Sequence, residues 1–439
     1  MQEDDEDRPE GNGPDGNTGL HDLGVLFVHG IGTQRRGETL SRCTGALYRW
    51  LEKWFSGSAT AWLQPRLSDA WLIAEDAGTG GPARCRLRLK EGSRTRESWL
   101  MAESHWADTF HAVPYHQMLA WALVSVPRTV FLHAINPALS LRLALELATP
   151  GRTAGSVDAD RSVELTGPDI ALRAFAGAAM LVLSPLLIAM VMVTLVLLFF
   201  LGLLPLDASR NAALYLQSKL AQTLGDSFLF ADNPVTEAAI VTRVQSDLLG
   251  LAHRCRRVVV VAPSQGAAVS YRALVGLTRD HCLPGVPMEF VTYGSGLRKL
   301  ADLSRGRQRR LALFGWCSAL LASALWYCLW QLLLQSSALA LTGVALLFCL
   351  LLLLVTLGSV ALPRPKEETP LAMDWFDFYA TRDPVPNGRV DVRFWGATAA
   401  TGSGRQLAGG LPYRRESLPV TNRHSLISDH STYWDAADD

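Results

Sequence analysis

Two apolar runs near the carboxyl terminus, each long enough to cross a bilayer, limit most strongly how this chain can fold. They cover Leu311–Leu334 and Ala338–Leu362, and only the triplet Gln335-Ser336-Ser337 separates them. The hydrocarbon core of a membrane is about 30 Å thick, which a helix of about 20 residues crosses. The Leu, Val and Phe side chains of the second run favour insertion by roughly 4–8 kcal/mol in total. The pattern predicts a transmembrane helical hairpin over residues 311–362.

The composition agrees with a membrane protein and argues against nucleic acid as a partner. Hydrophobic residues make up 49% of the chain, and 41 basic residues balance 41 acidic ones, whereas nucleic-acid binders usually carry a basic excess. The seven cysteines show no CxxC spacing and no HExxH pattern is present. We therefore expect free thiols in a reducing compartment, no metal site and no cofactor. Residues 1–19 are acidic and rich in Gly, Asn and Asp, which is typical of a disordered tail.

The first ordered segment has the pattern of a strand, a glycine loop and a helix. Asp22–His29 is a short apolar run that suits a strand buried on both faces of a parallel sheet. Gly30 and Gly32 follow it, and Leu40–Phe55 carries apolar residues at helical spacing. Residues 20–112 are therefore expected to form the amino-terminal part of an α/β domain.

A second strand, turn and helix surround Ser264. Val258–Val261 has a buried-strand pattern and breaks into Ala262-Pro263-Ser264-Gln265-Gly266 ahead of an Ala-rich helix. On such a turn the serine hydroxyl is raised at the carboxyl edge of the sheet. The neighbouring amides lie at a helix amino terminus, whose dipole favours an oxyanion. The pattern is typical of a nucleophile elbow, with Ala in place of the first Gly of GxSxG, although an ordinary strand-to-helix loop can have the same letters.

Four segments in order, VLFVHGIG, APSQGAA, YATRDPV and SDHSTYW, resemble the α/β-hydrolase superfamily, in particular bacterial lipase-like members of unassigned substrate. The resemblance covers roughly residues 20–110, 230–300 and 370–435. It implies an α/β fold with a mainly parallel sheet, helices on both faces and, here, transmembrane helical insertions. It also implies an oxyanion hole made by the amides of Ile31 and Gln265. The residues that would support this loop are His29, Gly30, Gly32 and Gly266.

The superfamily's order of nucleophile, acid and histidine implies Ser264, Asp383 and His430. Asp383 follows the aromatic-rich strand pattern of Trp375–Thr381, so its carboxylate would emerge at the edge of the sheet that carries the nucleophile. The rival acids are Asp374 and Asp377.

The choice of histidine depends on the sequence around it. His430 lies in Asp-His-Ser-Thr-Tyr-Trp, which resembles the superfamily's histidine loop more than the surroundings of the competing His424 do. His29 belongs to the oxyanion strand, and we expect it to hold that loop by a hydrogen bond rather than to act as the base. Residues 370–439 would then be the carboxyl-terminal part of the domain.

An amphipathic insertion is expected over residues 113–170. Gln117–Ala148 is apolar in patches, but Pro127-Arg128 and Asn136-Pro137 interrupt it. A central Arg costs about 2.5–3.5 kcal/mol in a membrane span. We expect an interfacial or lid-like pair of helices.

A membrane insertion is expected over residues 171–207. Ala174–Leu206 lacks charge and contains Ser184-Pro185. As one helix it would be about 50 Å long, and the segments on both sides must join the same sheet, so it should cross the bilayer an even number of times or not at all. We expect a short helical hairpin bent near Ser184-Pro185, or a re-entrant segment. Residues 208–300 return to the hydrolase domain with the elbow and with a helix over Pro234–Arg254, capped by Asn233.

These patterns together predict a membrane-anchored serine hydrolase that cleaves ester or acyl-thioester bonds of a lipid or acylated substrate. Arg298-Lys299 and four further arginines between 305 and 310 precede the hairpin, and Arg364 and Lys366 follow it. The positive-inside rule then places the catalytic domain on the cytosolic side of the inner membrane. Two other classes stay open: a non-catalytic signalling or scaffold protein with this shape, and an acyltransferase with the same triad.

Overall fold

The computed structural model describes residues 20–30, 34–56, 69–75, 82–91, 94–109, 114–148, 167–297, 300, 308–335, 338–361, 371, 373–380, 385 and 413–420. The acidic segment 1–19 lies outside these residues.

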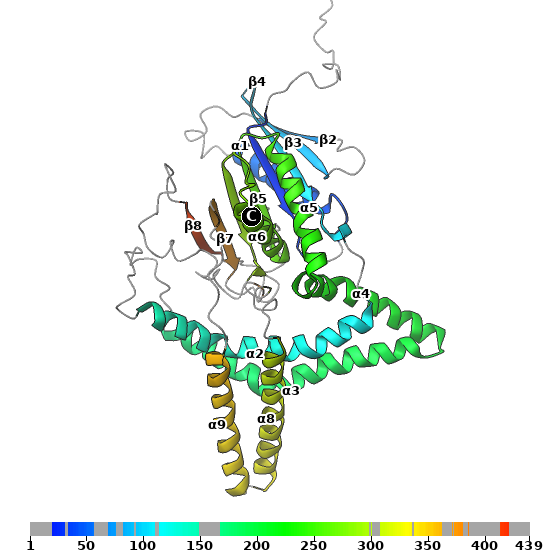
Figure 1. Cartoon of the computed structure of the whole chain (residues 1–439), viewed down its shortest axis with the longest axis vertical. Helices are drawn as coiled ribbons and strands as arrows, with labels where there is room; N and C mark the ends of the chain where they lie inside the picture. The colour runs from blue at the N-terminus through cyan, green and yellow to red at the C-terminus, as the bar shows by residue number, and fades with distance from the viewer. Residues whose placement is uncertain are drawn as a thin grey trace, which may run out of the picture.

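Eight strands form one sheet that is parallel over most of its width (Figure 1). In chain order they are β1 (Leu23–Val28), β2 (Asp69–Glu75), β3 (Arg84–Glu91), β4 (Arg94–Ser104), β5 (Val258–Pro263), β6 (Met288–Tyr293), β7 (Asp374–Ala380) and β8 (Arg415–Val420). Their order across the sheet is β2-β3-β4-β1-β5-β6-β7-β8. Neighbours from β4 to β8 are parallel, and β2 and β3 add an antiparallel edge. The expected mainly parallel α/β sheet is confirmed.

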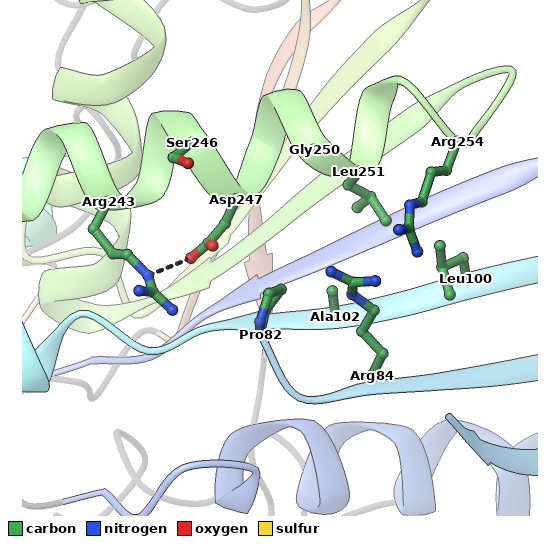
Figure 2. Close-up of a pocket in the computed structure, with 10 residues that line it drawn as sticks. All are labelled: Pro82, Arg84, Leu100, Ala102, Arg243, Ser246, Asp247, Gly250, Leu251 and Arg254. Carbon is green, nitrogen blue, oxygen red and sulfur yellow. Dashed lines mark hydrogen bonds and ion pairs between the residues drawn. The ribbon is translucent and has the colours of Figure 1, made fainter. Parts of the chain in front are cut away.

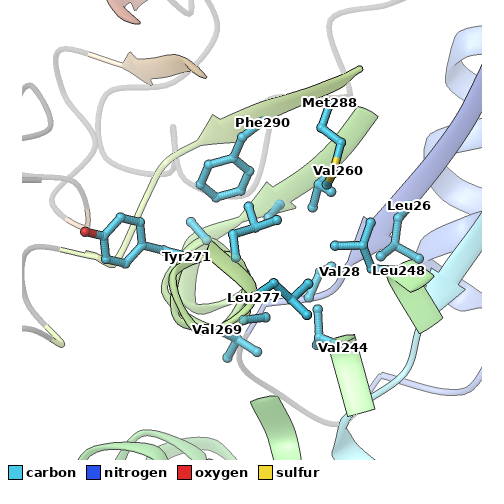
Figure 3. Packing of buried hydrophobic residues seen from close by; sticks show 14 of the residues in the cluster. Leu26, Val28, Val244, Leu248, Val260, Val269, Tyr271, Leu277, Met288 and Phe290 are labelled. Carbon is cyan, nitrogen blue, oxygen red and sulfur yellow. The ribbon is translucent and has the colours of Figure 1, made fainter. Parts of the chain in front are cut away.

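Helices cover both faces of this sheet. On one face lies α1 (Glu38–Ser56), which buries Leu40, Cys43 and Leu51 against β1 and β3. On the other face lie α5 (Pro234–Ala252) and α6 (Ser264–Arg279), and Figure 3 shows their side chains packed on β1, β5 and β6. All six residues of β1 are buried, as expected of a central parallel strand covered on both sides.

Helix α5 begins where the sequence predicts. The Asn233 side chain accepts hydrogen bonds of 3.1 Å from the backbone N–H groups of Val235 and Thr236, and Pro234 occupies the first turn. This cap satisfies two N–H groups that have no acceptor within the helix.

Three helices form a layer between the sheet and the carboxyl-terminal hairpin. They are α2 (Tyr115–Ala148), α3 (Gly167–Leu203) and α4 (Asp207–Asp232), and we call this layer the platform. The hairpin helices, α8 (Gln308–Gln335) and α9 (Ala338–Ala361), leave the platform on the side away from the sheet and run across the direction of α2 and α3 (Figure 1).

Three of these helices are long and apolar enough to cross a membrane: α3 over Gly177–Leu203, α8 over Ala312–Leu334 and α9 over Ala338–Gly358. Their surfaces remain apolar where they are exposed. On α9, for example, Leu339, Leu341 and Leu346 are each more than half exposed. The two helices of the expected hairpin are present with nearly the expected bounds.

The expected pair of helices in the first insertion is wrong, because α2 continues through Pro127 and Pro137. Pro127 has no N–H to donate to the carbonyl oxygen of Leu123, one turn earlier. Trp316 of α8 supplies a replacement donor, since its Nε1–H bonds that oxygen at 3.2 Å. Gly315 lets α8 approach, because a Cβ there would lie 2.3 Å from the Pro127 carbonyl oxygen.

The expected bend into a hairpin at Ser184-Pro185 is also wrong, because α3 is one helix with Pro185 inside it. Pro185 has no N–H to donate to the carbonyl oxygen of Leu181. A second tryptophan of α8, Trp326, donates from Nε1 to the next carbonyl oxygen, that of Val182, at 2.8 Å. Prolines are tolerated in apolar helices where a neighbouring helix bonds the perturbed turn.

We predict that Trp316→Phe lowers the stability of the helical region by about 0.5–1.5 kcal/mol, because the Leu123 carbonyl then loses its donor. Thermal unfolding of the purified protein in detergent measures this. Trp330→Phe is the matched control, since Trp330 is an exposed residue of the same helix. In a Pro127→Ala background, where the backbone N–H returns, Trp316→Phe should have little effect. Equal effects of Trp316→Phe in both backgrounds would contradict this account.

Candidate active site

Ser264 lies on a sharp turn between β5 and α6. Pro263 is the last residue of the strand, and Ser264 is the first residue of the helix, with φ of 49°. A non-glycine residue in this left-handed region costs of order 1–3 kcal/mol and persists only where the surroundings enforce it. The residue is 9% exposed. The strand, the strained turn and the helix that the sequence predicts around Ser264 are therefore all present.

Two glycines make room for this turn. A Cβ on Gly266 would lie 2.4 Å from the carbonyl oxygens of both Val28 and His29, so only glycine allows α6 to pass this close to β1. A Cβ on Gly30 would lie 3.1 Å from the Ser264 Cβ. Gly30 therefore brings the end of β1 directly beside the serine, as the expected oxyanion strand requires.

The amides around Gln265 form the amino terminus of α6. Backbone N–H groups in a first helical turn have no acceptor within the helix, so they are suited to an oxyanion. The Ser264 carbonyl oxygen accepts a 2.9 Å bond from the Gly296 N–H, which fixes the turn from outside. The Gln265 side chain meets α4, whose Ser227 hydroxyl lies 3.3 Å from its Oε1. Ile31 and Gly32, the other expected loop residues, lie outside the described residues.

His29 connects the end of β1 to the end of β4. Its Nε2 accepts from the N–H groups of Trp106 and Ala107 at 3.2 and 3.4 Å, and its Nδ1 donates to the Gly30 carbonyl oxygen at 2.8 Å. The Trp106 Nε1–H donates to the His29 carbonyl at 2.9 Å, and the two rings stack with centroids 4.5 Å apart. His29 therefore holds the loop by hydrogen bonds, as the sequence predicted.

His105 anchors the chain on the other side of the same loop. Its ring nitrogens face the carbonyl oxygen of Gln34 at 2.9 Å and the carboxylate of Asp108, in the short helix η2 (Ala107–Thr109), at 3.0 Å. The chain on both sides of residues 31–33 is thus bonded to the segment that follows β4, through His29 on one side and Gln34 on the other.

The acid and the histidine of the expected triad, Asp383 and His430, lie outside the described residues, as does the rival His424. Their strands are described, however. The residue pairs Pro263–Tyr293 and Tyr293–Phe378 link the ends of β5, β6 and β7, and Phe378 pairs with Leu418 of β8. The carboxyl ends of β7 and β8, after which Asp383 and His430 follow, therefore meet the edge of the sheet that carries Ser264.

The rival acids have other partners. The carboxylate of Asp377 is fully buried and accepts hydrogen bonds from the hydroxyls of Thr292 at 2.6 Å and Ser417 at 2.9 Å, one from each neighbouring strand. Asp374 accepts from the Arg414 N–H at 2.7 Å. Both carboxylates therefore serve to hydrogen-bond neighbouring segments of the sheet.

Some contacts of the site carried no sequence signal. The Gly296 N–H bonds the carbonyl oxygen of Ser264 directly, a contact that no sequence motif indicates. Trp106 and Ser227 were not singled out, because neither lies in a motif; only the proximity that the fold creates identifies them. Comparison with protein-family models, curated proteins and solved structures finds no match.

We predict that His29 makes the folded state sensitive to mild acid. Burial lowers the pKa of His29 from 6.5 to about 4. The unfolded chain binds this proton below pH 6.5 while the folded chain does not. The stability that the buried neutral ring provides is therefore complete above pH 6.5 and decreases as the pH falls towards 4, by about 3 kcal/mol. Unfolding of the wild type and His29→Gln should be compared between pH 7.5 and 4.5.

In that comparison His29→Gln should be less stable at pH 7.5 but lose less stability on acidification. Parallel pH profiles of the two proteins would show that His29 is already protonated in the fold or that its burial is incomplete.

Proposed function

We propose that this chain is a membrane-anchored serine hydrolase of the α/β-hydrolase type, with Ser264 as its nucleophile. The observation that carries the proposal is the positive φ of Ser264 at the β5–α6 turn, with Gly266 against the carbonyls of β1. The strained turn places the Ser264 hydroxyl beside the amino terminus of α6. A hydroxyl in this position suits acyl transfer, because the helix amides can stabilise an oxyanion.

The strand order supports the remaining assignments. In this proposal His430 takes the proton of the Ser264 hydroxyl as its oxygen attacks the carbonyl carbon of the substrate. The amides of Gln265 and Ile31 stabilise the resulting oxyanion. The leaving group departs with the proton from His430, and water then releases the acid from Ser264 by the same steps. Asp383 orients the imidazole.

The position of the platform supports an ester or acyl-thioester substrate with a lipid-like acyl chain. The platform faces the carboxyl edge of the sheet (Figure 1), and Ser227 of α4 reaches the Gln265 side chain. A substrate that enters from the bilayer would meet Ser264 between these two layers.

Labelling with a fluorophosphonate tests the nucleophile and separates an enzyme from a scaffold. Wild-type protein in detergent should be labelled, and Ser264→Ala should not. Ser270→Ala is a control, since Ser270 is a buried serine of the same helix. Labelling that persists in Ser264→Ala would reject the proposal.

The same measurements test the triad. His430→Ala should remove nearly all turnover, and adding it to Ser264→Ala should cost little more, because triad members act as a unit. Asp383→Asn should slow turnover roughly 10⁴-fold through the wrong imidazole tautomer. His424→Ala and Asp377→Asn are the paired alternatives. If either abolishes turnover in folded protein while its counterpart is harmless, that assignment moves to the alternative residue.

We further propose that the catalytic domain is cytosolic and that α3 lies along the membrane instead of crossing it. The chain enters the platform from β4 and leaves it into α5, so a crossing by α3 would require a second crossing in α2 or α4. Helix α2 contains Arg128 and α4 contains several charged residues, both costly in a span. One face of α3 exposes an apolar stripe suited to lipid: Leu186, Met190, Val193, Leu197 and Phe200.

Cysteines introduced into a background without native thiols test this topology. A cysteine at Ser336, between the hairpin helices, should react with an impermeant maleimide outside intact cells. Cysteines at Asp302, Glu368 and Leu206, the last between α3 and α4, should react only after the membrane is opened. External labelling at Asp302 or Glu368 would overturn the orientation. External labelling at Leu206 alone would show that α3 crosses.

A further inference from the structure

A basic hollow lies between α5 and the edge of the sheet, away from Ser264. It has a volume of about 280 Å³ and is lined by residues of α5, β3 and β4 (Figure 2). Three arginines line it, Arg84 from β3 and Arg243 and Arg254 from α5 and its end, whereas Asp247 is the one acidic side chain among the described lining residues.

The alternation of β3 explains why arginines collect on this face. Its sequence is Arg-Cys-Arg-Leu-Arg-Leu, so side chains of opposite character point to opposite faces. Cys85, Leu87 and Leu89 are buried beneath α1. The arginines, of which Arg84 lines the hollow, therefore lie on the face that α5 covers. Along α5 the lining positions 243, 247, 250 and 254 recur at helical spacing and form one stripe.

One arginine is held in place by a buried network. The Asp247 carboxylate, 7% exposed, accepts a 3.0 Å bond from the Nε of Arg243 and a 2.8 Å bond from the Ser104 hydroxyl. The bond to Asp247 uses the Nε of Arg243. Among the described residues, the two terminal nitrogens of the Arg243 guanidinium remain available to a ligand. An arginine fixed in this way loses less conformational entropy when it binds an anion.

The other two guanidinium groups converge from different elements. In Figure 2 those of Arg254 and Arg84 point toward each other between α5, which contributes Leu251, and β4, which contributes Leu100 and Ala102. Each of these three apolar residues is at most 4% exposed. An anion between these two guanidinium groups can accept hydrogen bonds from both, and the apolar side chains beside it strengthen that attraction by excluding water.

We propose that this hollow binds the phosphate group of a phosphorylated ligand between the guanidinium groups of Arg84 and Arg254, while Arg243 and the Ser246 hydroxyl, further along α5, are available to other polar groups of the same ligand. Guanidinium groups bind phosphate through paired, charge-assisted hydrogen bonds. The hollow holds more than a single phosphate, so a diphosphate or a phosphate with a small organic group fits its volume. The site uses no residue of the Ser264 machinery and is independent of the proposed hydrolase activity.

Calorimetric titration with inorganic pyrophosphate tests the site, using purified full-length protein in detergent at 0.15 M salt, where loose attraction to surface charge is largely screened. We expect saturable binding by the wild type and by Ser264→Ala. Arg254→Gln should weaken binding at least about tenfold. Arg256→Gln is the matched control, because Arg256 lies two residues away, is exposed, pairs with Asp22 and does not line the hollow.

Substitutions of Gly250 test whether pyrophosphate occupies the hollow, because they change its free volume and leave its charge unchanged. A Cβ on Gly250 meets no atom within 4 Å, so both Gly250→Ala and Gly250→Met should fold. The longer side chain would fill the hollow, so Gly250→Met should lose pyrophosphate binding and Gly250→Ala should keep it. Absence of saturable binding by the wild type, or equal weakening by Arg254→Gln and Arg256→Gln, would overturn the proposal.

Titrations of the protein in lipid nanodiscs distinguish a lipid headgroup from a soluble phosphorylated ligand. Pyrophosphate should bind to the protein in phosphatidylcholine discs. If the hollow receives a lipid headgroup, adding phosphatidic acid will lower the apparent affinity in the wild type but not further in Arg254→Gln. Unchanged affinity will assign the hollow to a soluble phosphorylated ligand.

Discussion

The first turn of α6 lies against the carbonyl oxygens of Val28 and His29, so closely that any side chain at position 266 would collide with them and only glycine fits there. This close crossing brings β1, β5 and α6 together at one point and forces Ser264 into the left-handed region. The strain there is of order 1–3 kcal/mol. It is offset by the burial of α6, whose Val269, Tyr271 and Leu274 are nearly inaccessible, since each large apolar side chain contributes about 1.5–3 kcal/mol. The packing of the helix therefore maintains the strained turn.

The loop beside Ser264 depends on a second constraint, a buried imidazole. A charged His29 would be costly at this depth, and burial holds its pKa at about 4. The ring is therefore neutral at physiological pH, which gives it one donor and one acceptor. Gly30 uses the donor, and the amides of Trp106 and Ala107 use the acceptor. The proposed oxyanion strand is thus tied to β4 by a group that cannot also act as the base.

The sequence predicted those parts of the fold whose cause is local. Periodicity identified the buried strands and α1, the Asn233-Pro234 pair identified the start of α5, and length and lack of charge identified α8 and α9. The elbow at Ser264 was predictable because its small residues are required by a contact that every such turn makes. Asp383 and His430 rest on the order of motifs, and the parallel strands that precede them are consistent with it.

The errors share one physical origin, which is compensation by residues distant in the sequence. Pro127 and Pro185 suggested breaks, because a proline removes a backbone donor. Trp316, 193 positions from its acceptor, bonds the carbonyl that Pro127 leaves without a donor, and Trp326, 144 positions from its acceptor, bonds the carbonyl next to the one that Pro185 affects. Nothing near either proline in the sequence indicates such a partner. A proline in an apolar helix therefore predicts a requirement for an external donor, and a break follows only where that donor is missing.

These same tryptophans help determine how the α/β domain is attached to the hairpin. Helix α8 belongs to the hairpin by its apolar surface, yet it bonds both α2 and α3 and packs Gly315 against the Pro127 carbonyl. Arg128, the residue that made α2 unsuitable as a span, is fully buried here instead of facing lipid. Because α4 in turn reaches Gln265 through Ser227, packed side chains connect the hairpin to the elbow. The fold itself, rather than the length of a linker, therefore sets the distance of Ser264 from the hairpin.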